Sequence, residues 1–287
     1  MKRIAKYFAL VKFAHTIFAM PFALMAFSYA LWSTEAEFEW WLLLQVVLCM
    51  VFARNVAMGF NRWADRKIDA ENPRTAEREI PAGKITPRNA MIFVVVNAIL
   101  FIATACTINS LTAILSPVAL AVIMLYSYCK RFTALAHIVL GLSLAIAPAG
   151  AYIAVTGTLD MAACLLSLVV LTWCGGFDII YALQDAEFDR KRGLHSIPST
   201  FSTAISLYIS IALHCVSVVA LVLYALEQPQ SWLLWCGVAL FTAILVAEHI
   251  LVTPTRQRSI GIAFGTLNGL ASLTLAAFVI ANIIIFG

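Results

Sequence analysis

Long apolar stretches alternate with shorter polar breaks along almost the whole chain. Each stretch is close to the roughly 20 residues that an α-helix needs to cross a bilayer. The pattern therefore predicts an all-α membrane protein with nine transmembrane helices, at residues 13–32, 40–60, 89–108, 112–129, 134–155, 161–183, 201–226, 231–252 and 260–285. The break at 61–88 is the longest, and we expect a single domain over residues 1–287.

The distribution of charge supports this layout. Of the 287 residues, 62% are hydrophobic and 12% are charged, whereas soluble domains are typically about 25% charged. Of the 19 Lys and Arg residues, all but Arg54 lie in or beside the N-terminal tail and the breaks at 61–88, 130–133, 184–200 and 253–259, and Arg54 lies one or two turns inside the helix before the first of these breaks. The other breaks carry only acidic charges, at Glu35, Glu37, Glu39, Asp160 and Glu227.

This asymmetry predicts a cytoplasmic N-terminus, because positive charge concentrates in cytoplasmic loops. We expect an integral protein of the bacterial cytoplasmic membrane, with the basic breaks facing the cytoplasm. The net charge of +4 then reflects orientation and does not indicate a nucleic-acid partner. Residues 1–30 could also be read as a signal peptide, but the apolar run of about 20 residues containing Pro21 favours a retained helix.

Two acidic runs stand out against the apolar background: NRWADRKID at residues 61–69 and YALQDAEFD at residues 181–189. Each contains two aspartates four residues apart, and a helix would direct both carboxylates from the same face. If the helices continue through the runs, the polar face of each helix also includes a residue that precedes the run. The first face then comprises Arg54, Asn61, Asp65 and Asp69, and the second comprises Asp178, Tyr181, Asp185 and Asp189. Ionisable residues at membrane depth are costly and usually functional.

Carboxylate oxygens in this number suit Mg²⁺, which proteins commonly hold together with substrate phosphates. Two such clusters facing each other could hold a diphosphate through metal ions, and nearby cations would balance its charge. The candidate cations are Arg66, Arg74, Arg78, Lys130, Arg131 and Lys191. Departure of a diphosphate from an allylic chain would leave a carbocation that an electron-rich ring can attack. The apolar helices would hold the isoprenoid tail.

Four segments resemble the UbiA superfamily of intramembrane aromatic prenyltransferases. Asn61, Asp65 and Asp69 resemble its NDxxDxxxD motif, and Tyr181, Asp185 and Asp189 its YxxxDxxxD motif. The stretch RTAEREIPAGKIT at residues 74–86 is similar to the family's RTxxRPLPxGxxT continuation, and Tyr126 with Lys130-Arg131 resembles its YxxxKR element. Two positions depart from the pattern: Arg62 replaces the first aspartate of many members, and Glu79-Ile80-Pro81 replaces the usual Arg-Pro-Leu-Pro.

The resemblance implies nine transmembrane helices around a central cavity open to the cytoplasmic side, and Mg²⁺-dependent transfer of a polyprenyl group from its diphosphate to an aromatic acceptor. It implies that Asn61, Asp65, Asp69, Asp185 and Asp189 bind Mg²⁺. It assigns catalytic roles to the four aspartates and Arg66, and it implies that Asp185 also helps to activate the phenol of the acceptor. Substrate contacts fall to Asn61, Arg74, Arg78, Tyr126, Lys130, Arg131, Tyr181 and Lys191.

Within the superfamily the chain looks most like the 4-hydroxybenzoate polyprenyltransferases of respiratory quinone biosynthesis. The phrases MGFNRWADRKIDAENPRT and GFDIIYALQDAEFDRKRGLHSIPS are also similar to the subgroup that prenylates naphthoates for menaquinone. The acceptor alternatives are therefore 1,4-dihydroxy-6-naphthoate and 1,4-dihydroxy-2-naphthoate. Besides these substrates we expect contact with membrane lipid and no obligate protein partner.

Two other classes of membrane protein use intramembrane acids. Ion-coupled transporters do so, but their sites lie near the bilayer midplane, whereas these aspartates gather at one membrane face. A CDP-alcohol phosphotransferase would also use Mg²⁺ and aspartates, but in one continuous cluster.

Several polar residues in or near the helices have no assigned role. His15, Arg54, Glu248 and Asn268 either line the cavity or form hydrogen bonds between helices. Asp178 either supports the second motif or is an ordinary interfacial residue. His137 and His214 are interpreted as packing residues.

Overall fold

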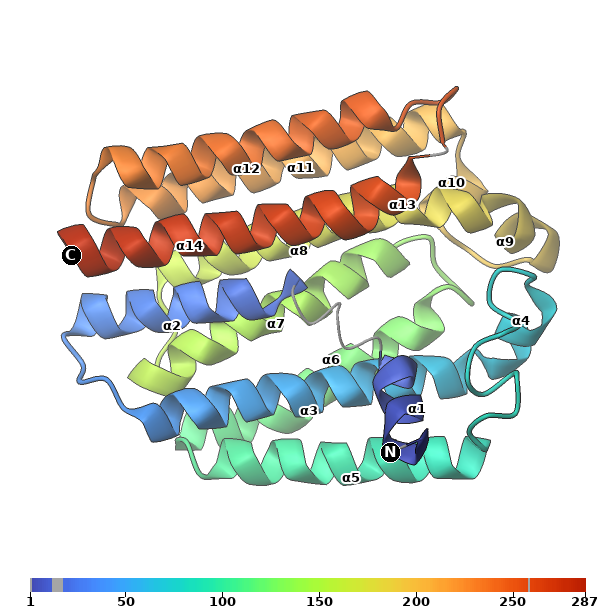
Figure 1. The fold of residues 1–287 in the computed structure, drawn as a ribbon, viewed down its shortest axis with the longest axis horizontal. Helices are drawn as coiled ribbons and strands as arrows, with labels where there is room; N and C mark the ends of the chain where they lie inside the picture. Colours follow the sequence, from blue (N-terminus) through green and yellow to red (C-terminus); the bar gives the residue numbers. More distant parts are fainter. Residues whose placement is uncertain (1, 12–17, 258) are drawn as a thin grey trace.

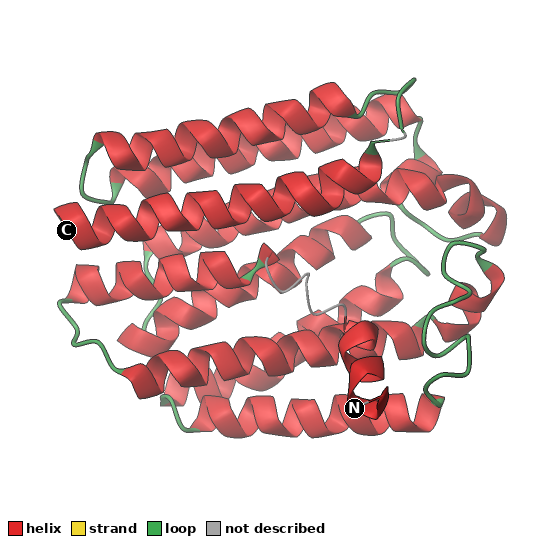
Figure 2. Cartoon of the chain, in the orientation of Figure 1, coloured by secondary structure: helices red, strands yellow, loops and turns green. Residues whose placement is uncertain are grey.

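The computed structural model describes residues 2–11, 18–257 and 259–287, which fold into a bundle whose long helices run side by side in roughly one direction (Figures 1 and 2). No strand occurs in these ranges beyond an isolated bridge between Thr253 and Arg256. The elements are α1 (Lys2–Val11), α2 (Met20–Thr34), α3 (Trp40–Ala64), α4 (Arg66–Glu71), α5 (Pro87–Cys106), α6 (Ser110–Cys129), α7 (Ala136–Thr156), α8 (Met161–Ala182), the 3₁₀ turn η2 (Leu183–Asp185), α9 (Ala186–Arg192), α10 (Ile197–Thr200), α11 (Thr203–Leu226), α12 (Trp232–Leu251), α13 (Ile260–Ile262), the π-helical turn η3 (Ala263–Leu267) and α14 (Asn268–Phe286).

Eight of the nine predicted spans are confirmed as helices long and apolar enough to cross a membrane, among the described residues. The span predicted at 13–32 is not confirmed. Its described part is α2, which has 15 residues and begins at Met20, while 12–17, including His15, lie outside the described residues. The other predicted ends agree with the structure to within a few residues.

Helix ends follow local chemistry. Thr86 accepts a hydrogen bond from Asn89 N at 3.2 Å and Pro87 occupies the first turn, which together fix the start of α5. In the middle of the bundle, Gly141 brings α7 against α8, because a Cβ at that position would lie 2.1 Å from the carbonyl oxygen of Leu171. The main core is built around fully buried Trp173.

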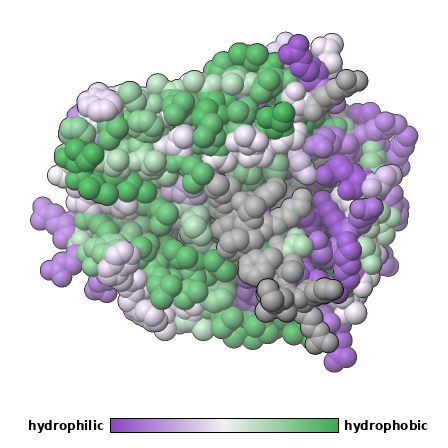
Figure 3. Space-filling model, in the orientation of Figure 1, coloured by the Kyte–Doolittle hydropathy of each residue, from purple (hydrophilic) through white to green (hydrophobic). Residues whose placement is uncertain are grey.

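Hydrophobic residues cover most of the visible surface along the helices, and hydrophilic residues gather at the end that carries α4, α9 and α10 (Figure 3). We call this the polar end. It brings together the two acidic runs, which are about 120 residues apart in the sequence. The exposed apolar flanks are those expected of helices in contact with lipid.

Both acidic runs interrupt their helices at the first aspartate. The helix α3 ends at Ala64 and α4 begins at Arg66, with Asp65 between them at φ −92° and ψ 6°. Asp185 closes the turn η2 between α8 and α9 at φ −107° and ψ 0°. These values belong to the sparsely populated region near ψ 0°, where many active-site residues lie. The chain therefore does not form an unbroken helix through either run. The longer polar faces considered in the sequence analysis depended on such unbroken helices.

Candidate active site

A polar pocket opens between α3–α4, α6 and α8–α9 at the polar end. All of the predicted site residues except Arg66 and Lys191 line it, together with Asn72 and Asp178. The pocket is thus built from both acidic runs, the loop after the first run and the end of α6. It combines five aspartates with four arginine or lysine side chains among the described residues: Asp65, Asp69, Asp178, Asp185 and Asp189, with Arg74, Arg78, Lys130 and Arg131.

The aspartates of the first run are held by an amide and two arginines. Asp65 Oδ2 accepts from Asn61 Nδ2 at 3.1 Å, and Asp65 Oδ1 accepts from Arg131 Nη2 at 3.1 Å. Asp69 Oδ1 accepts from Arg78 Nη1 at 2.7 Å. Burial raises the pKa of Asp65, a shift that the hydrogen bond from Arg131 opposes.

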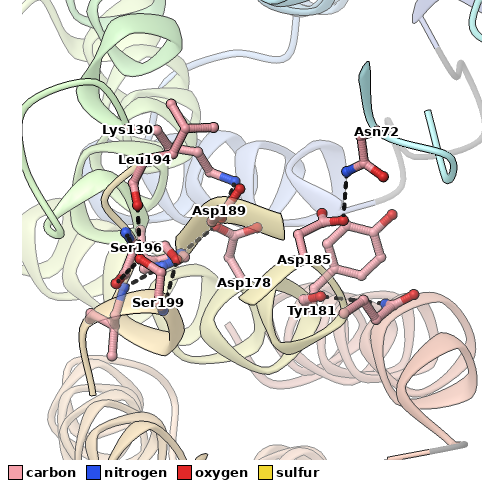
Figure 4. A network of polar contacts seen from close by, with 12 residues as sticks. Asn72, Lys130, Asp178, Tyr181, Asp185, Asp189, Leu194, Ser196 and Ser199 are labelled. Atoms are coloured by element: carbon pink, nitrogen blue, oxygen red, sulfur yellow. Dashed lines mark hydrogen bonds and ion pairs between the residues drawn. The ribbon is translucent and has the colours of Figure 1, made fainter. Parts of the chain in front are cut away.

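The second run is tied to the loop that follows the first. Asp185 Oδ1 accepts from Asn72 Nδ2 at 3.0 Å and from Arg74 Nε at 2.8 Å, while Arg74 Nη2 bonds to Oδ2. The same guanidinium donates to the hydroxyl of Tyr181 at 2.8 Å. Burial lowers the pKa of Arg74, but the hydrogen bonds and charges of Asp185 and Tyr181 together outweigh burial and raise that pKa. The two motifs therefore form one connected network, part of which is seen in Figure 4.

Asp189 faces Lys130, as Figure 4 shows, with Nζ 3.7 Å from Oδ2. Burial lowers the pKa of Lys130, but the charges of Asp189 and three further aspartates outweigh it and raise that pKa. The backbone of this lysine is fixed as well, because His195 N donates to Lys130 O at 2.7 Å. This bond joins the segment after the second run to the end of α6.

A second, apolar cavity begins where the polar pocket ends. It is lined mainly by α3, α6 and α7, and it shares Asn61 and Tyr126 with the polar pocket. Arg54 is the only charged side chain among the described residues that line it. The Nε of Arg54 is buried and has no hydrogen-bond partner in the part of the chain that the structure describes. A polar group buried in this way usually has a partner.

The donor set of the polar pocket suits a hard cation that arrives with a ligand. Asp69 Oδ2 and Asp189 Oδ2 are both buried without a hydrogen-bond partner among the described residues. No three His, Cys, Asp or Glu side chains in those residues are grouped closely enough to hold a metal ion alone. Mg²⁺ typically takes few protein carboxylates and completes its shell with water and phosphate oxygens. The oxygens present therefore fit Mg²⁺ bound to a phosphorylated substrate.

Two predicted site residues lie elsewhere. Arg66 donates to the carbonyl oxygen of Trp63 at 2.6 Å and stacks on that indole at 4.7 Å. Lys191 is 75% exposed and pairs with Glu187 one helical turn away. Neither lines the polar pocket.

Asn72 has a role that the sequence analysis missed. Its side-chain oxygen accepts from Arg74 N at 2.9 Å. Its amide also reaches Asp185, 113 residues away. The only sequence signal was an amide residue three positions after Asp69, in the long loop beside the site.

Comparison with known proteins gives a consistent result. A model of the UbiA prenyltransferase family matches residues 19–283. A 4-hydroxybenzoate octaprenyltransferase of Aeromonas salmonicida (strain A449) is 29% identical over 253 residues, covering 88% of this chain and 87% of that one. An apo UbiA homologue from Aeropyrum pernix K1 superposes with a TM-score of 0.83 at 28% identity, covering 93% and 97% of the two chains.

A UbiA homologue from Archaeoglobus fulgidus, solved with GPP and Mg²⁺ bound, has the same fold. Its TM-score is 0.74 at 18% identity, and the match covers 98% of this chain and 100% of that one.

Proposed function

The chain belongs to the UbiA prenyltransferase family, and we propose that this prenyltransferase moves a polyprenyl group from polyprenyl diphosphate to 4-hydroxybenzoate in respiratory quinone biosynthesis. The observation that carries the proposal is the junction of two unlike chambers at Asn61 and Tyr126. One chamber is rich in charge and suits a diphosphate. The other is almost wholly apolar and suits an isoprenoid chain. A substrate with a charged head and a long apolar tail fits both at once.

The residues that would hold Mg²⁺ are Asn61, Asp65, Asp69, Asp185 and Asp189. Bound there with the diphosphate, the metal would supply Lewis-acid stabilisation of the leaving group. Arg74, Arg78, Lys130 and Arg131 would contact phosphate oxygens, as charge-assisted donors do. With the diphosphate bound in the pocket, these cations would stabilise the negative charge that builds up as the C–O bond breaks.

Arg54 is the group best placed to bind the acceptor. It lies on α3 about two turns from Asn61, inside the apolar cavity, with an unpartnered Nε among the described residues. A guanidinium matches a carboxylate in charge and geometry. An aromatic acid with its carboxylate on Arg54 would have its ring near the junction of the two chambers. The same reasoning applies to 1,4-dihydroxy-6-naphthoate and 1,4-dihydroxy-2-naphthoate, which remain the alternative acceptors.

The placement of the site favours an enzyme over a transporter. The polar pocket lies at one end of the bundle, whereas transporter sites lie near the middle of the membrane. Because the positive charges gather at this end, we propose that it faces the cytoplasm of a bacterium, with the chain in the cytoplasmic membrane.

The test is prenyl transfer by the purified protein in lipid nanodiscs, with polyprenyl diphosphate and each of the three acceptors. The proposal predicts product with 4-hydroxybenzoate when Mg²⁺ is present and none with EDTA. Asp65→Asn should lose activity, whereas the exposed control Lys191→Ala should keep it. Product only from a naphthoate would correct the acceptor. No product from any acceptor, or equal product in EDTA, would reject the proposal.

A further inference from the structure

Asp178 is unlike the other aspartates of the polar pocket. Asp65, Asp69, Asp185 and Asp189 each lie within ion-pair distance of an arginine or lysine. Asp178 instead pairs with a histidine, and no Lys or Arg among the described residues lies within ion-pair distance of it. A cation beside a carboxylate favours its ionised form and makes it a poorer proton acceptor. The pocket thus contains one carboxylate in a different chemical setting.

The histidine is fully buried and its orientation is fixed at both ring nitrogens. His137 Nδ1 lies 2.7 Å from Asp178 Oδ2, and Ile197 N donates to His137 Nε2 at 3.3 Å. Since Nε2 accepts, the ring proton is on Nδ1 and is donated to Asp178. His137 therefore holds one carboxylate oxygen of Asp178 in place.

The segment that holds His137 in its orientation is itself fixed by hydrogen bonds. Ile197 begins α10, where Ser196 and Ser199 form a reciprocal capping box with bonds of 2.8 and 3.1 Å. The neighbouring His195 N is bonded to Lys130 O. Figure 4 shows this serine pair beside Lys130 and Asp189, close to the second acidic run. The segment after the second motif therefore positions His137, and through it Asp178.

The other oxygen of Asp178 is available to the pocket. Asp178 Oδ1 makes no hydrogen bond to any residue that the structure describes, and the side chain lines the polar pocket at 12% exposure. Asp185, which the resemblance suggested as the phenol-activating group, differs in this respect. Both of its oxygens are occupied by Arg74, and one also by Asn72.

We propose that Asp178 is the catalytic carboxylate that takes the hydroxyl proton of the aromatic acceptor, and that His137 is the residue that positions it. This rests on the proposed function. The acceptor's O–H bond breaks and its proton moves to Asp178 Oδ1. The ring carbon ortho to the hydroxyl bonds to C1 of the prenyl group, whose C–O bond breaks with its electrons leaving on the diphosphate. That ring carbon then loses its hydrogen to water as a proton, and Asp178 returns its proton to the acceptor oxygen.

The test compares Asp178→Asn with wild type in the transfer assay. We expect kcat to fall about 100-fold or more, within the range for loss of a general base. The KM for polyprenyl diphosphate and the Mg²⁺-dependent binding of an unreactive polyprenyl thiolodiphosphate should not change. A 3-fluoro acceptor, whose hydroxyl ionises more easily, should restore much of the lost rate, a result that a structural defect would not give. Unchanged kcat in Asp178→Asn, or no gain with the fluorinated acceptor, would overturn the proposal.

Variants of His137 test the positioning role. Glutamine can donate to Asp178 and accept from Ile197 N, so His137→Gln should keep most of the wild-type kcat. His137→Leu should lower kcat about as much as Asp178→Asn while the prenyl KM stays unchanged. Equal rates for His137→Leu and His137→Gln would overturn the role of His137. Failure of wild type to prenylate any acceptor would reject the proposed function, and this assignment with it.

Discussion

The polar pocket and the apolar cavity meet at two residues but are built on opposite principles. In the polar pocket, every aspartate of the two motifs lies within ion-pair distance of a cation. Asp65, Asp69 and Asp185 are also joined to their arginines by hydrogen bonds. Among the described residues that line the cavity, Arg54 carries the only charge, and it lies among small and aliphatic residues such as Ala53, Ala57 and Gly150. The first environment recognises a ligand by charge and geometry, and the second by apolar area without direction.

This difference predicts two kinds of sensitivity to mutation. Removing one partner of a buried, hydrogen-bonded charge pair leaves the other uncompensated, which is costly. Changing the apolar lining alters only the area or volume available to the prenyl chain, and each Å² of buried apolar surface contributes about 25 cal/mol to binding. Substitutions in the polar pocket should therefore switch activity off, whereas those in the cavity should change which substrates are used.

The largest effect is expected for Asp185→Asn in the polar pocket. The substitution removes a proposed metal ligand and weakens the clamp that Arg74 and Asn72 form on this side chain. We expect kcat for prenyl transfer to fall by about 10²–10³, the range seen when one preorganised electrostatic group is lost. Arg74→Lys, which keeps the charge but loses the bidentate geometry, is the matched variant and should fall less. Activity of Asp185→Asn within a few-fold of wild type would contradict the expectation that substitutions in the polar pocket switch activity off.

Arg54→Met should produce a smaller and more selective effect. Loss of a hydrogen bond to a charged group typically costs about 1.5–3 kcal/mol, so KM for the aromatic acid should rise about 10- to 100-fold. The KM for polyprenyl diphosphate should stay constant. The methyl ester of the acceptor is the control, because it lacks the carboxylate and should not distinguish the variant from wild type. A rise in the prenyl KM instead would assign Arg54 to the other substrate.

A graded effect is expected for Gly150→Leu in the apolar cavity. A Cβ at this position has no heavy atom within 4 Å, so the new side chain would project into open space. We expect kcat/KM for long prenyl donors to fall roughly tenfold, since about two methylene groups lose their place at about 0.8 kcal/mol each. Short donors should react as before. Gly261→Leu, at an equally open position outside the cavity, should show no dependence on chain length. Equal losses with short and long donors would contradict the assignment of the tail.

The smallest effect is expected for Lys191→Ala. The side chain is exposed and its pair with Glu187 lies outside both chambers. Exposed pairs of this type contribute little to stability, and this one touches neither chamber, so transfer rates should stay close to those of wild type. Lys130→Ala, which removes the partner of Asp189 in the polar pocket, is the contrasting variant. A strong loss in Lys191→Ala would extend the site beyond the pocket.

The sequence allowed the helical architecture and most of the polar pocket to be predicted, because both depend on local patterns. Apolar length identifies membrane helices, and the spacing of Asp65 and Asp69 or of Asp185 and Asp189 identifies a functional face. The sequence did not show that the chain bends at Asp65. After this bend Arg66 turns towards Trp63 rather than towards the pocket. A basic residue beside a motif aspartate therefore need not share its pocket.

The pairings across the pocket were beyond prediction for a different reason. Asn72 and Asp185 are 113 residues apart, and His137 and Asp178 are 41 residues apart on different helices. Such contacts depend on how α7, α8 and the loop after α4 pack together, which no periodicity in a single chain records. Asp178 had two equally good interpretations until the buried histidine was seen beside it.

The most direct test of the two-chamber account is an experimental structure with Mg²⁺ and an unreactive polyprenyl thiolodiphosphate. The account predicts the diphosphate between Asp65 and Asp185, in contact with Arg74 and Arg131. It also predicts that the chain passes Asn61 and Tyr126 into the apolar cavity between α3 and α7. A diphosphate bound outside the polar pocket, or a chain lying on the outer surface of the bundle, would contradict it.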